Sequence, residues 1–118
     1  HVPSAVATKK MVDAELLARM PVGAIVINTS RGDIVDEEAL IKAMDEKGIR
    51  AGLDVFRGEP SDGEVEFQSA LARHPNVYGT HHIGASTDQA QAAVASGVIE
   101  ILDAFSRGNI QHCVNMDT

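Results

Sequence analysis

The chain has 118 residues and a formal net charge of −7 at pH 7, and 44% of its residues are hydrophobic but only 3% aromatic. We therefore expect one domain, residues 1–118, with an aliphatic core, and no binding to nucleic acid or anionic membranes, because the negative charge would repel phosphate groups. The single cysteine, Cys113, excludes an internal disulfide and most thiolate metal sites. The sequence contains no apolar run of membrane-spanning length and no leader, so a cytoplasmic protein is the default expectation.

Helical and strand-like segments alternate along the chain, which is typical of an α/β fold with a parallel sheet. The first helix is predicted over residues 13–20, because Asp13 can cap it and the helix breakers Pro21 and Gly23 follow. Its apolar face would consist of Leu16, Leu17 and Met20. The continuous apolar run at residues 24–28 then predicts a strand that is buried on both faces.

A second helix is predicted after Asp36, which can cap it, and Gly48 provides a stop signal at its other end. The apolar stripe of this helix would be Ala39, Leu40, Ala43 and Met44. Two further short strands are predicted at residues 52–55 and 77–79, and a weak helix is expected at residues 64–73.

The last helix has the clearest pattern in the chain. Ser86 and Gln89 fit a capping box, and the helix is predicted to continue to Arg107, just before Gly108. Its apolar positions recur at helical spacing: Ala90, Val94, Gly97, Val98, Ile101 and Phe105. Because a helix of this length must bury a single apolar stripe, we expect it to have a partner surface.

Polar clusters follow the three predicted strands, at the end of a parallel sheet where ligands usually bind. In the first cluster, Arg31 stands next to Gly32 directly after a strand, where its guanidinium can hold a planar carboxylate through two parallel hydrogen bonds. An ion pair between Arg31 and Asp33 or Asp36 explains this segment equally well when it is considered alone.

The second cluster follows the strand at residues 52–55. Asp54, at the strand end, can accept a hydrogen bond from an amide group of a ligand. Glu59, held by the rigid Pro60, can orient an imidazole, but residues 58–60 taken alone favour a simple turn.

The third cluster contains the adjacent histidines His81 and His82. A histidine is the side chain best suited to proton transfer near neutral pH. A metal-binding module that uses both of them with His112 is the alternative, and it is disfavoured because neighbours in an extended segment point to opposite sides.

Taken in this order, residues 1–3, 28–37, 54–60 and 82–91 resemble the D-isomer-specific 2-hydroxyacid dehydrogenases, and the similarity extends over nearly the whole chain. The run His82-Ile83-Gly84-Ala85-Ser86-Thr87, with Ala90-Gln91, is most similar to the D-3-phosphoglycerate dehydrogenase branch. The resemblance implies the C-terminal half of a dinucleotide-binding domain: a partial Rossmann-like fold with about three parallel strands, flanking helices and a long C-terminal helix. It also implies a portion of an NAD-dependent oxidoreductase, with NADP not excluded, acting on a small-molecule 2-hydroxyacid or 2-oxoacid, above all 3-phosphoglycerate.

The resemblance assigns a role to each cluster. His82 would be the general acid that protonates the substrate oxygen, and Glu59 would hold and charge its imidazole. Arg31 would bind the substrate carboxylate, and Asp54 would orient the nicotinamide amide. The residues that would line the cofactor are Thr29, Ser30, Arg31, Asp54, His82, Ile83, Gly84 and Ala85, and His1, Pro3 and Thr8 match the family's loop beside the adenosine side.

Two departures from the family pattern bear on activity. His81 stands where many members have a proline, and the Gly-x-Gly-x-x-Gly turn of the family, like its substrate domain, has no counterpart in these residues. We therefore expect negligible turnover by the isolated chain, and the alternative hypothesis is a truncated, non-catalytic relic that folds as a small oligomer and binds NAD weakly or not at all. Half of a doubly wound sheet exposes an unpaired edge, which predicts a homodimer or a rearranged packing that covers it.

Overall fold

The computed structural model describes residues 2–60 and 67–115 and divides the chain into two compact units. The first unit, His1–Ile83, holds the sheet and the shorter helices, and the second, Gly84–Thr118, holds the longest helix. The elements in chain order are α1 (Ala14–Arg19), β1 (Ile25–Asn28), the 3-10 helix η1 (Gly32–Ile34), α2 (Glu37–Lys47), β2 (Arg50–Leu53), β3 (Val77–Gly79) and α3 (Asp88–Ser106).

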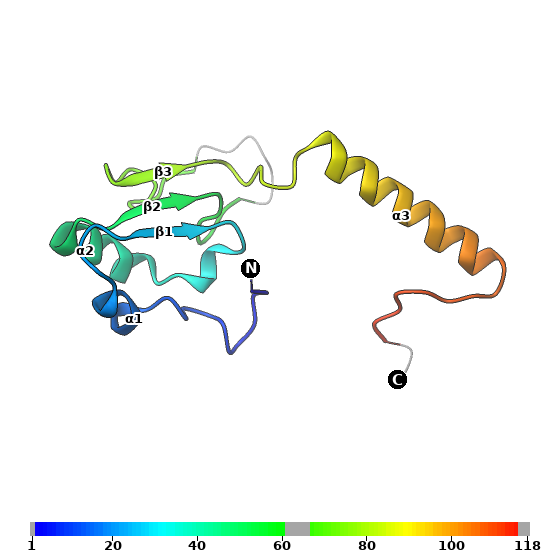
Figure 1. Ribbon diagram of the computed structural model, residues 1–118, viewed down its shortest axis with the longest axis horizontal. Coiled ribbons are helices and arrows are strands. Elements are labelled where there is room, and N and C mark those ends of the chain that lie inside the picture. Colours follow the sequence, from blue (N-terminus) through cyan, green and yellow to red (C-terminus); the bar gives the residue numbers. More distant parts are fainter. Residues whose placement is uncertain (1, 61–66, 116–118) are drawn as a thin grey trace. The chain divides into compact units, whose positions relative to one another are not determined.

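The three strands of the first unit form one parallel sheet in the order β1, β2, β3 (Figure 1). The register pairs Asn28 with Leu53 and Leu53 with Gly79, so the carboxyl ends of the three strands lie level. The segments that follow the strands therefore leave from the same edge of the sheet. The predicted α/β fold, with three parallel strands and flanking helices, is confirmed.

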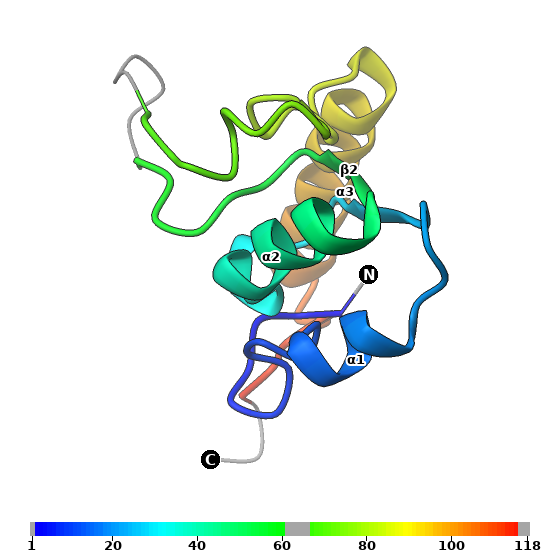
Figure 2. The same ribbon diagram turned by 90° about the vertical axis from the view of Figure 1, so that its left-hand side faces the viewer.

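The helices α1 and α2 begin where their capping residues predict and lie side by side (Figure 2). The Asp13 carboxylate accepts a hydrogen bond from the backbone N–H of Leu16 at 2.9 Å, and the Asp36 carboxylate accepts one from Ala39 at 3.2 Å. Gly48 ends α2 in the left-handed region, at φ 62°, which a glycine adopts without a Cβ clash. Both predicted N-caps and the predicted C-terminal glycine are confirmed.

The core lies between these helices and one face of the sheet. Its largest fully buried side chains are Leu17, Leu40, Met44, Ile49 and Leu71. The strands add Val26, Ala51 and Leu53. The prediction that Leu16 shares the buried face of α1 is wrong, because only Leu17 of this six-residue helix is buried and Leu16 is exposed.

The strand β1 is buried on one face rather than two, which corrects the prediction made from its apolar run. Val26 and Asn28 are buried, whereas the side chains of Ile25 and Ile27 are 55% and 74% exposed. Successive side chains of a strand point to opposite faces, and α1 and α2 cover only the face that carries Val26. An apolar run therefore shows that both faces of a strand are suited to burial. It does not show whether other parts of the chain cover both faces.

Two other predicted boundaries differ from the structure. β2 begins at Arg50 and ends at Leu53, because its pairing with β1 starts at Ile25 and Arg50. Part of the helix predicted at residues 64–73 lies outside the described residues, and residues 67–73 form no helix but a turn in which the backbone N–H of Arg73 donates to the carbonyl of Ser69 at 3.2 Å. Pro75 explains why this turn does not continue, since a proline disfavours helical backbone in the preceding residue.

The second unit consists of α3 and the residues around it. Its N-cap is Thr87, whose hydroxyl accepts a hydrogen bond from the backbone N–H of Ala90 at 3.1 Å, so the predicted capping box at Ser86 is wrong by one residue. Large apolar side chains are exposed along the helix: Val94, Val98, Ile99, Ile101, Leu102 and Phe105. Among the described residues, no helix combines the length and apolar character needed to cross a membrane.

Candidate active site

Two buried polar side chains mark the carboxyl edge of the sheet, Asn28 at the end of β1 and Asp54 directly after β2. A buried polar group needs hydrogen-bond partners, and Asn28 finds them in the segment that follows it. Its Nδ2 donates to the carbonyl of Arg31 at 2.8 Å, while its Oδ1 accepts from the backbone N–H and the hydroxyl of Ser30 at 3.1 and 2.8 Å. Asn28 therefore sets the course of residues 29–31.

Asp54 performs the same task for the segment after β3. Its Oδ1 accepts a hydrogen bond from the Thr80 hydroxyl at 2.5 Å and another from the backbone N–H of Ile83 at 2.9 Å. Its backbone carbonyl accepts from the N–H of His82 at 2.8 Å. Residues 80, 82 and 83 are thus all hydrogen-bonded to Asp54, two through its carboxylate and one through its backbone carbonyl.

These hydrogen bonds bring His82 to Glu59, the imidazole–carboxylate pair expected from the sequence. The Nδ1 atom of His82 lies 2.9 Å from Oε2 of Glu59, and the two side chains are 50% and 25% exposed. An ionised carboxylate only accepts hydrogen bonds, so Nδ1 carries the proton and Nε2 is the nitrogen that can exchange a proton with a ligand. The other carboxylate oxygen of Glu59 accepts from the backbone N–H of Phe56, which fixes the side chain within its own turn.

The segments after β1 and β2 pack directly against each other. A Cβ atom on Gly32 would lie 2.1 Å from the carbonyl carbon of Phe56, so only glycine permits this approach. The Glu37 carboxylate, in the first turn of α2, accepts a hydrogen bond from the backbone N–H of Arg57 at 2.7 Å. These contacts hold the segment that carries Arg31 against the turn that carries Glu59.

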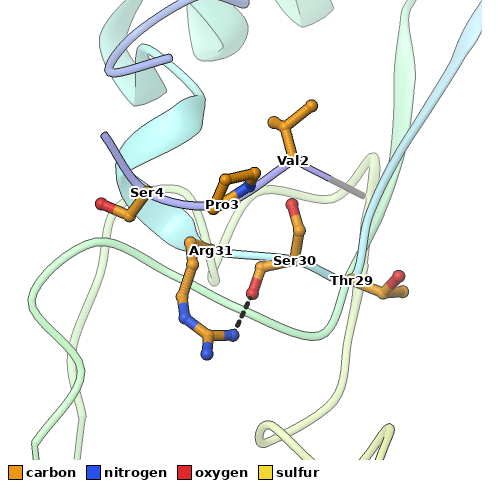
Figure 3. Close-up of a pocket in the computed structure, with 6 residues that line it drawn as sticks. All are labelled: Val2, Pro3, Ser4, Thr29, Ser30 and Arg31. Carbon is orange, nitrogen blue, oxygen red and sulfur yellow. Dashed lines mark hydrogen bonds between the residues drawn. The ribbon is translucent and has the colours of Figure 1, made fainter. Parts of the chain in front are cut away.

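Arg31 lines a surface pocket together with residues from the start of the chain. The pocket is lined by Val2, Pro3, Ser4, Thr29, Ser30 and Arg31 (Figure 3). The Arg31 guanidinium donates to the carbonyl of Ser30 at 2.7 Å. Among the described residues, no hydrogen bond or ion pair joins Arg31 to Glu59 or His82, and the packed loops connect the two groups.

The alternative partners considered for Arg31 are engaged elsewhere. Asp33 accepts a hydrogen bond from the Ser4 hydroxyl at 2.5 Å, and Asp36 pairs with Lys10 at 3.0 Å. The hydrogen bond from Lys10, supported by the backbone N–H of Ala39, holds the pKa of Asp36 below its ordinary value of 3.8. Within residues 2–60 and 67–115, neither Asp33 nor Asp36 forms an ion pair with Arg31, so the ion-pair interpretation of this segment is wrong.

The arrangement of strands and loops agrees with what comparison with known proteins shows. Residues 1–84 match the D-isomer specific 2-hydroxyacid dehydrogenase, NAD binding domain family. The chain belongs to this family. Of the dehydrogenases similar to it, D-3-phosphoglycerate dehydrogenase 2, chloroplastic, of Arabidopsis thaliana is 40% identical over 93% of this chain. Glyoxylate/hydroxypyruvate reductase B of Enterobacter agglomerans is 41% identical over 92% of this chain.

A solved dehydrogenase structure extends the likeness to the fold. The crystal structure of D-lactate dehydrogenase with NAD+ from Lactobacillus jensenii superposes with a TM-score of 0.80 at 30% identity, over 95% of this chain and 37% of that one. The chain spans 17% of the Arabidopsis relative and 33% of the Enterobacter relative.

The residues expected to line the dehydrogenase site lie in different parts of the structure. Pro3, Thr29, Ser30 and Arg31 line the pocket, whereas Asp54, Glu59, His82 and Ile83 are connected by hydrogen bonds. Thr8 does not line the pocket but contacts a residue that does, because its hydroxyl donates to the carbonyl of Pro3 at 2.6 Å. Gly84 and Ala85 belong to the second unit, and His1 lies outside the described residues. In the part of the chain that the structure describes, no group of three or more His, Cys, Asp or Glu side chains is placed to hold a metal ion.

Sequence reasoning missed four residues that shape the site: Asn28, Gly32, Glu37 and Thr80. Asn28 had a usable signal, because an Asn followed by Thr and Ser after an apolar run favours a side-chain-to-backbone turn. A carboxylate at Glu37, in the first turn of α2, is favoured by the helix dipole alone, so nothing in the local sequence indicates its bond to Arg57. Gly32 and Thr80 act through residues far along the chain, and no local pattern identifies such contacts.

Proposed function

We propose that this chain supplies the proton-transfer and part of the cofactor-binding machinery of an NAD-dependent D-2-hydroxyacid dehydrogenase. The observation that carries the proposal is the contact of 2.9 Å between His82 Nδ1 and Glu59 Oε2, formed between two strand-end segments. Arg31 emerges from the neighbouring segment without a carboxylate partner among the described residues. A proton carrier and a carboxylate-binding guanidinium are the two groups that oxidation of a 2-hydroxyacid requires.

The residues around the pocket have the chemistry needed for a dinucleotide. Thr29 and Ser30 offer hydroxyl groups, and Val2 and Pro3 offer apolar surface. Asp54 is proposed to orient the nicotinamide amide as well as the loop, since a carboxylate has about four lone-pair sites. When bound, NAD would accept the hydride from C2 of the hydroxyacid.

The chain's own residues then account for the proton. In the oxidation direction, neutral His82 would accept the hydroxyl proton at Nε2, and the resulting imidazolium would be stabilised by the Glu59 carboxylate on Nδ1. In the reduction direction, the same imidazolium would return the proton to the carbonyl oxygen. Arg31 would hold the substrate carboxylate through two hydrogen bonds and thereby fix the position of C2.

The favoured substrate is 3-phosphoglycerate. The similarity of residues 82–91 to the phosphoglycerate dehydrogenase branch supports this choice, and so does the Arabidopsis relative. The reductase and lactate dehydrogenase relatives define the competing substrates: glyoxylate or hydroxypyruvate, and D-lactate. We expect a complete dehydrogenase that contains this chain to prefer 3-phosphoglycerate in a side-by-side spectrophotometric assay, and a preference for either competitor would refute the choice.

Calorimetric titration with NAD tests the cofactor role of the chain itself. The 118 residues contain no Gly-x-Gly-x-x-Gly turn, so backbone donors for the pyrophosphate are missing and we expect binding weaker than about micromolar, with negligible turnover. Chemical shifts at millimolar NAD should change at Thr29, Ser30 and Arg31 but not in α1, and a parallel titration with NADP compares the two cofactors. Micromolar affinity would contradict the expectation of weak binding, and shifts confined to α1 would contradict the site. If the chain does turn over, His82→Ala should abolish the activity.

The second candidate is the truncated, non-catalytic relic of a dehydrogenase that the sequence left open. Gene context distinguishes the two. An upstream reading frame that encodes the turn would support the enzyme, whereas a start codon close to His1 would support the relic.

The assembly that we propose is a homodimer that covers the open sheet. In the described sheet β1 has no strand on its outer side, and Ile25 and Ile27 are exposed on its uncovered face. Exposed strand edges and apolar surfaces both favour association. Light scattering at micromolar concentration should give the mass of a dimer, and a monomer mass would contradict this assembly.

A further inference from the structure

Thr80 occupies a position between the sheet and the candidate proton carrier. It follows β3 directly, and its backbone N–H donates to the carbonyl of Leu53 at 2.9 Å, which extends the pairing with β2 by one residue. Its hydroxyl donates to Oδ1 of Asp54 at 2.5 Å. Thr80 thus connects the end of β3 with the buried carboxylate of Asp54, which follows the neighbouring strand β2.

Asp54 accepts hydrogen bonds from three residues of the same short segment. Besides the Thr80 hydroxyl, it receives the backbone N–H groups of His82 and Ile83, at 2.8 and 2.9 Å. Residues 80, 82 and 83 are therefore all tied to one residue that is only 6% exposed. His82 has little freedom to move unless Asp54 moves with it.

The backbone of His82 needs such restraint. Its φ of 59° lies in the left-handed region, which is unfavourable for a residue with a Cβ atom. Residues held in this region persist where surrounding contacts over-determine the conformation. The N–H groups of His82 and Ile83, one on each side of the His82 Cα atom, both donate to Asp54. These two hydrogen bonds hold the unfavourable backbone conformation and direct the imidazole toward Glu59.

We propose that Thr80 is a positioning residue: through Asp54 it holds His82 in the orientation that places Nδ1 on Glu59. Threonine suits this task because its branched side chain has few rotamers and its hydroxyl makes a charge-assisted bond to the carboxylate. Without the hydroxyl, Asp54 loses a donor within the protein, and the carboxylate can turn away from the Ile83 N–H. The inference rests on the proposed function only for the proton-transfer role of His82. The contact between His82 and Glu59 itself does not depend on a bound cofactor.

The test measures the His82 side chain directly by NMR of the ¹⁵N-labelled 118-residue chain. In Thr80→Val, which keeps the shape but removes the hydroxyl, hydrogen exchange at His82 Nδ1 should accelerate by about tenfold or more, the scale of one lost bond to a charged group. The Nδ1-protonated form should also lose its dominance. Thr80→Ser, which restores the hydroxyl, should behave like the wild type. Thr87→Val removes a hydroxyl of the same kind from the cap of α3 and should leave His82 unchanged.

Backbone amide signals of β1 and α2 separate positioning from folding. These signals should stay in place in Thr80→Val, and Thr80→Ala provides a smaller side chain if the valine does not fit. An unchanged His82 exchange rate in a folded Thr80→Val or Thr80→Ala chain would overturn the proposal. So would loss of the β1 and α2 signals in both variants, because Thr80 would then serve the fold as a whole. The NMR measurement needs neither NAD nor substrate. The positioning role of Thr80 can therefore be confirmed or refuted even if the proposed dehydrogenase function is wrong.

Discussion

Replacing Gly32 with alanine tests whether the segments after β1 and β2 are packed as closely as the structure shows. A Cβ atom at this position would lie 2.1 Å from the carbonyl carbon of Phe56, 2.3 Å from its oxygen and 2.5 Å from the backbone nitrogen of Arg57. The opposing atoms are all backbone, so no side chain can rotate away. The two segments must separate.

The size of the effect follows from the distance. Carbon atoms in contact prefer a separation of about 3.5 Å, so the 2.1 Å approach requires a displacement of about 1.4 Å. Overpacking of this kind typically costs about 1–3 kcal/mol. We expect Gly32→Ala to lie at the upper end of that range, because relief of the clash also strains the Glu37 bond to Arg57.

Urea unfolding followed by circular dichroism measures the loss. With a slope of about 2 kcal/mol per molar urea, a loss of about 3 kcal/mol lowers the unfolding midpoint by about 1.5 M. Gly52→Ala is the matched control, since its new Cβ would meet the Ile27 side chain at an ordinary 3.8 Å. The control should change the free energy of unfolding by less than about 0.5 kcal/mol, or raise it slightly. If Gly32→Ala unfolds at the same midpoint as Gly52→Ala, the two segments do not pack as described.

The remaining predictions concern stability. The Lys47 ammonium donates to the carbonyls of Leu17, Ala18 and Met20 at 3.1, 2.8 and 2.5 Å, so Lys47→Met should lower the free energy of unfolding by about 1–3 kcal/mol. Lys42→Met, which removes only an exposed pairing at 3.8 Å, should cost less than about 1 kcal/mol, and equal losses in chemical denaturation would refute the capping role of Lys47. Because the pKa of Asp36 is held below 3.8, its ionised form stabilises the fold above about pH 5 and loses this effect as the pH falls through the lowered pKa. Asp36→Asn keeps a capping side chain but cannot ionise, so its stability deficit against the wild type should vanish in acid, and a deficit that persists at low pH would contradict this linkage.

The contrast between β1 and α2 shows how far periodicity can be trusted. The apolar stripe predicted for α2 was Ala39, Leu40, Ala43 and Met44; the last three are buried, and Ala39 is partly buried against the same core. The apolar run of β1 predicted burial on both faces, but Ile25 and Ile27 are exposed. A helix with one apolar face needs one partner, and the rest of this chain provides it. A strand with two apolar faces needs two partners, and within the first unit the described residues provide one.

In the candidate site, too, the sequence indicated individual residues, whereas the contacts between them became visible only in the structure. Arg31, Glu59 and His82 were singled out because each follows a predicted strand and because together, in this order, the three clusters resemble the family pattern. The pairing of Glu59 with His82 spans 23 positions, and the bond from Thr80 to Asp54 spans 26, so neither follows from neighbouring residues. Whether Arg31 and the His82–Glu59 pair act on one substrate stays a prediction.

The sequence by itself determined where the helices begin and end, at Asp13, Asp36 and Gly48, and that there are three parallel strands. It could do so because caps and periodicity depend on residues within about one helical turn. Tertiary structure alone decided that Gly32 must lack a side chain, that Asp54 holds the segment of His82, and that one face of β1 stays open. These features depend on which distant surfaces meet once the strands are in register. That register places the carboxyl ends of all three strands on one edge of the sheet, where polar residues from separate parts of the chain, such as Glu59 and His82, come together.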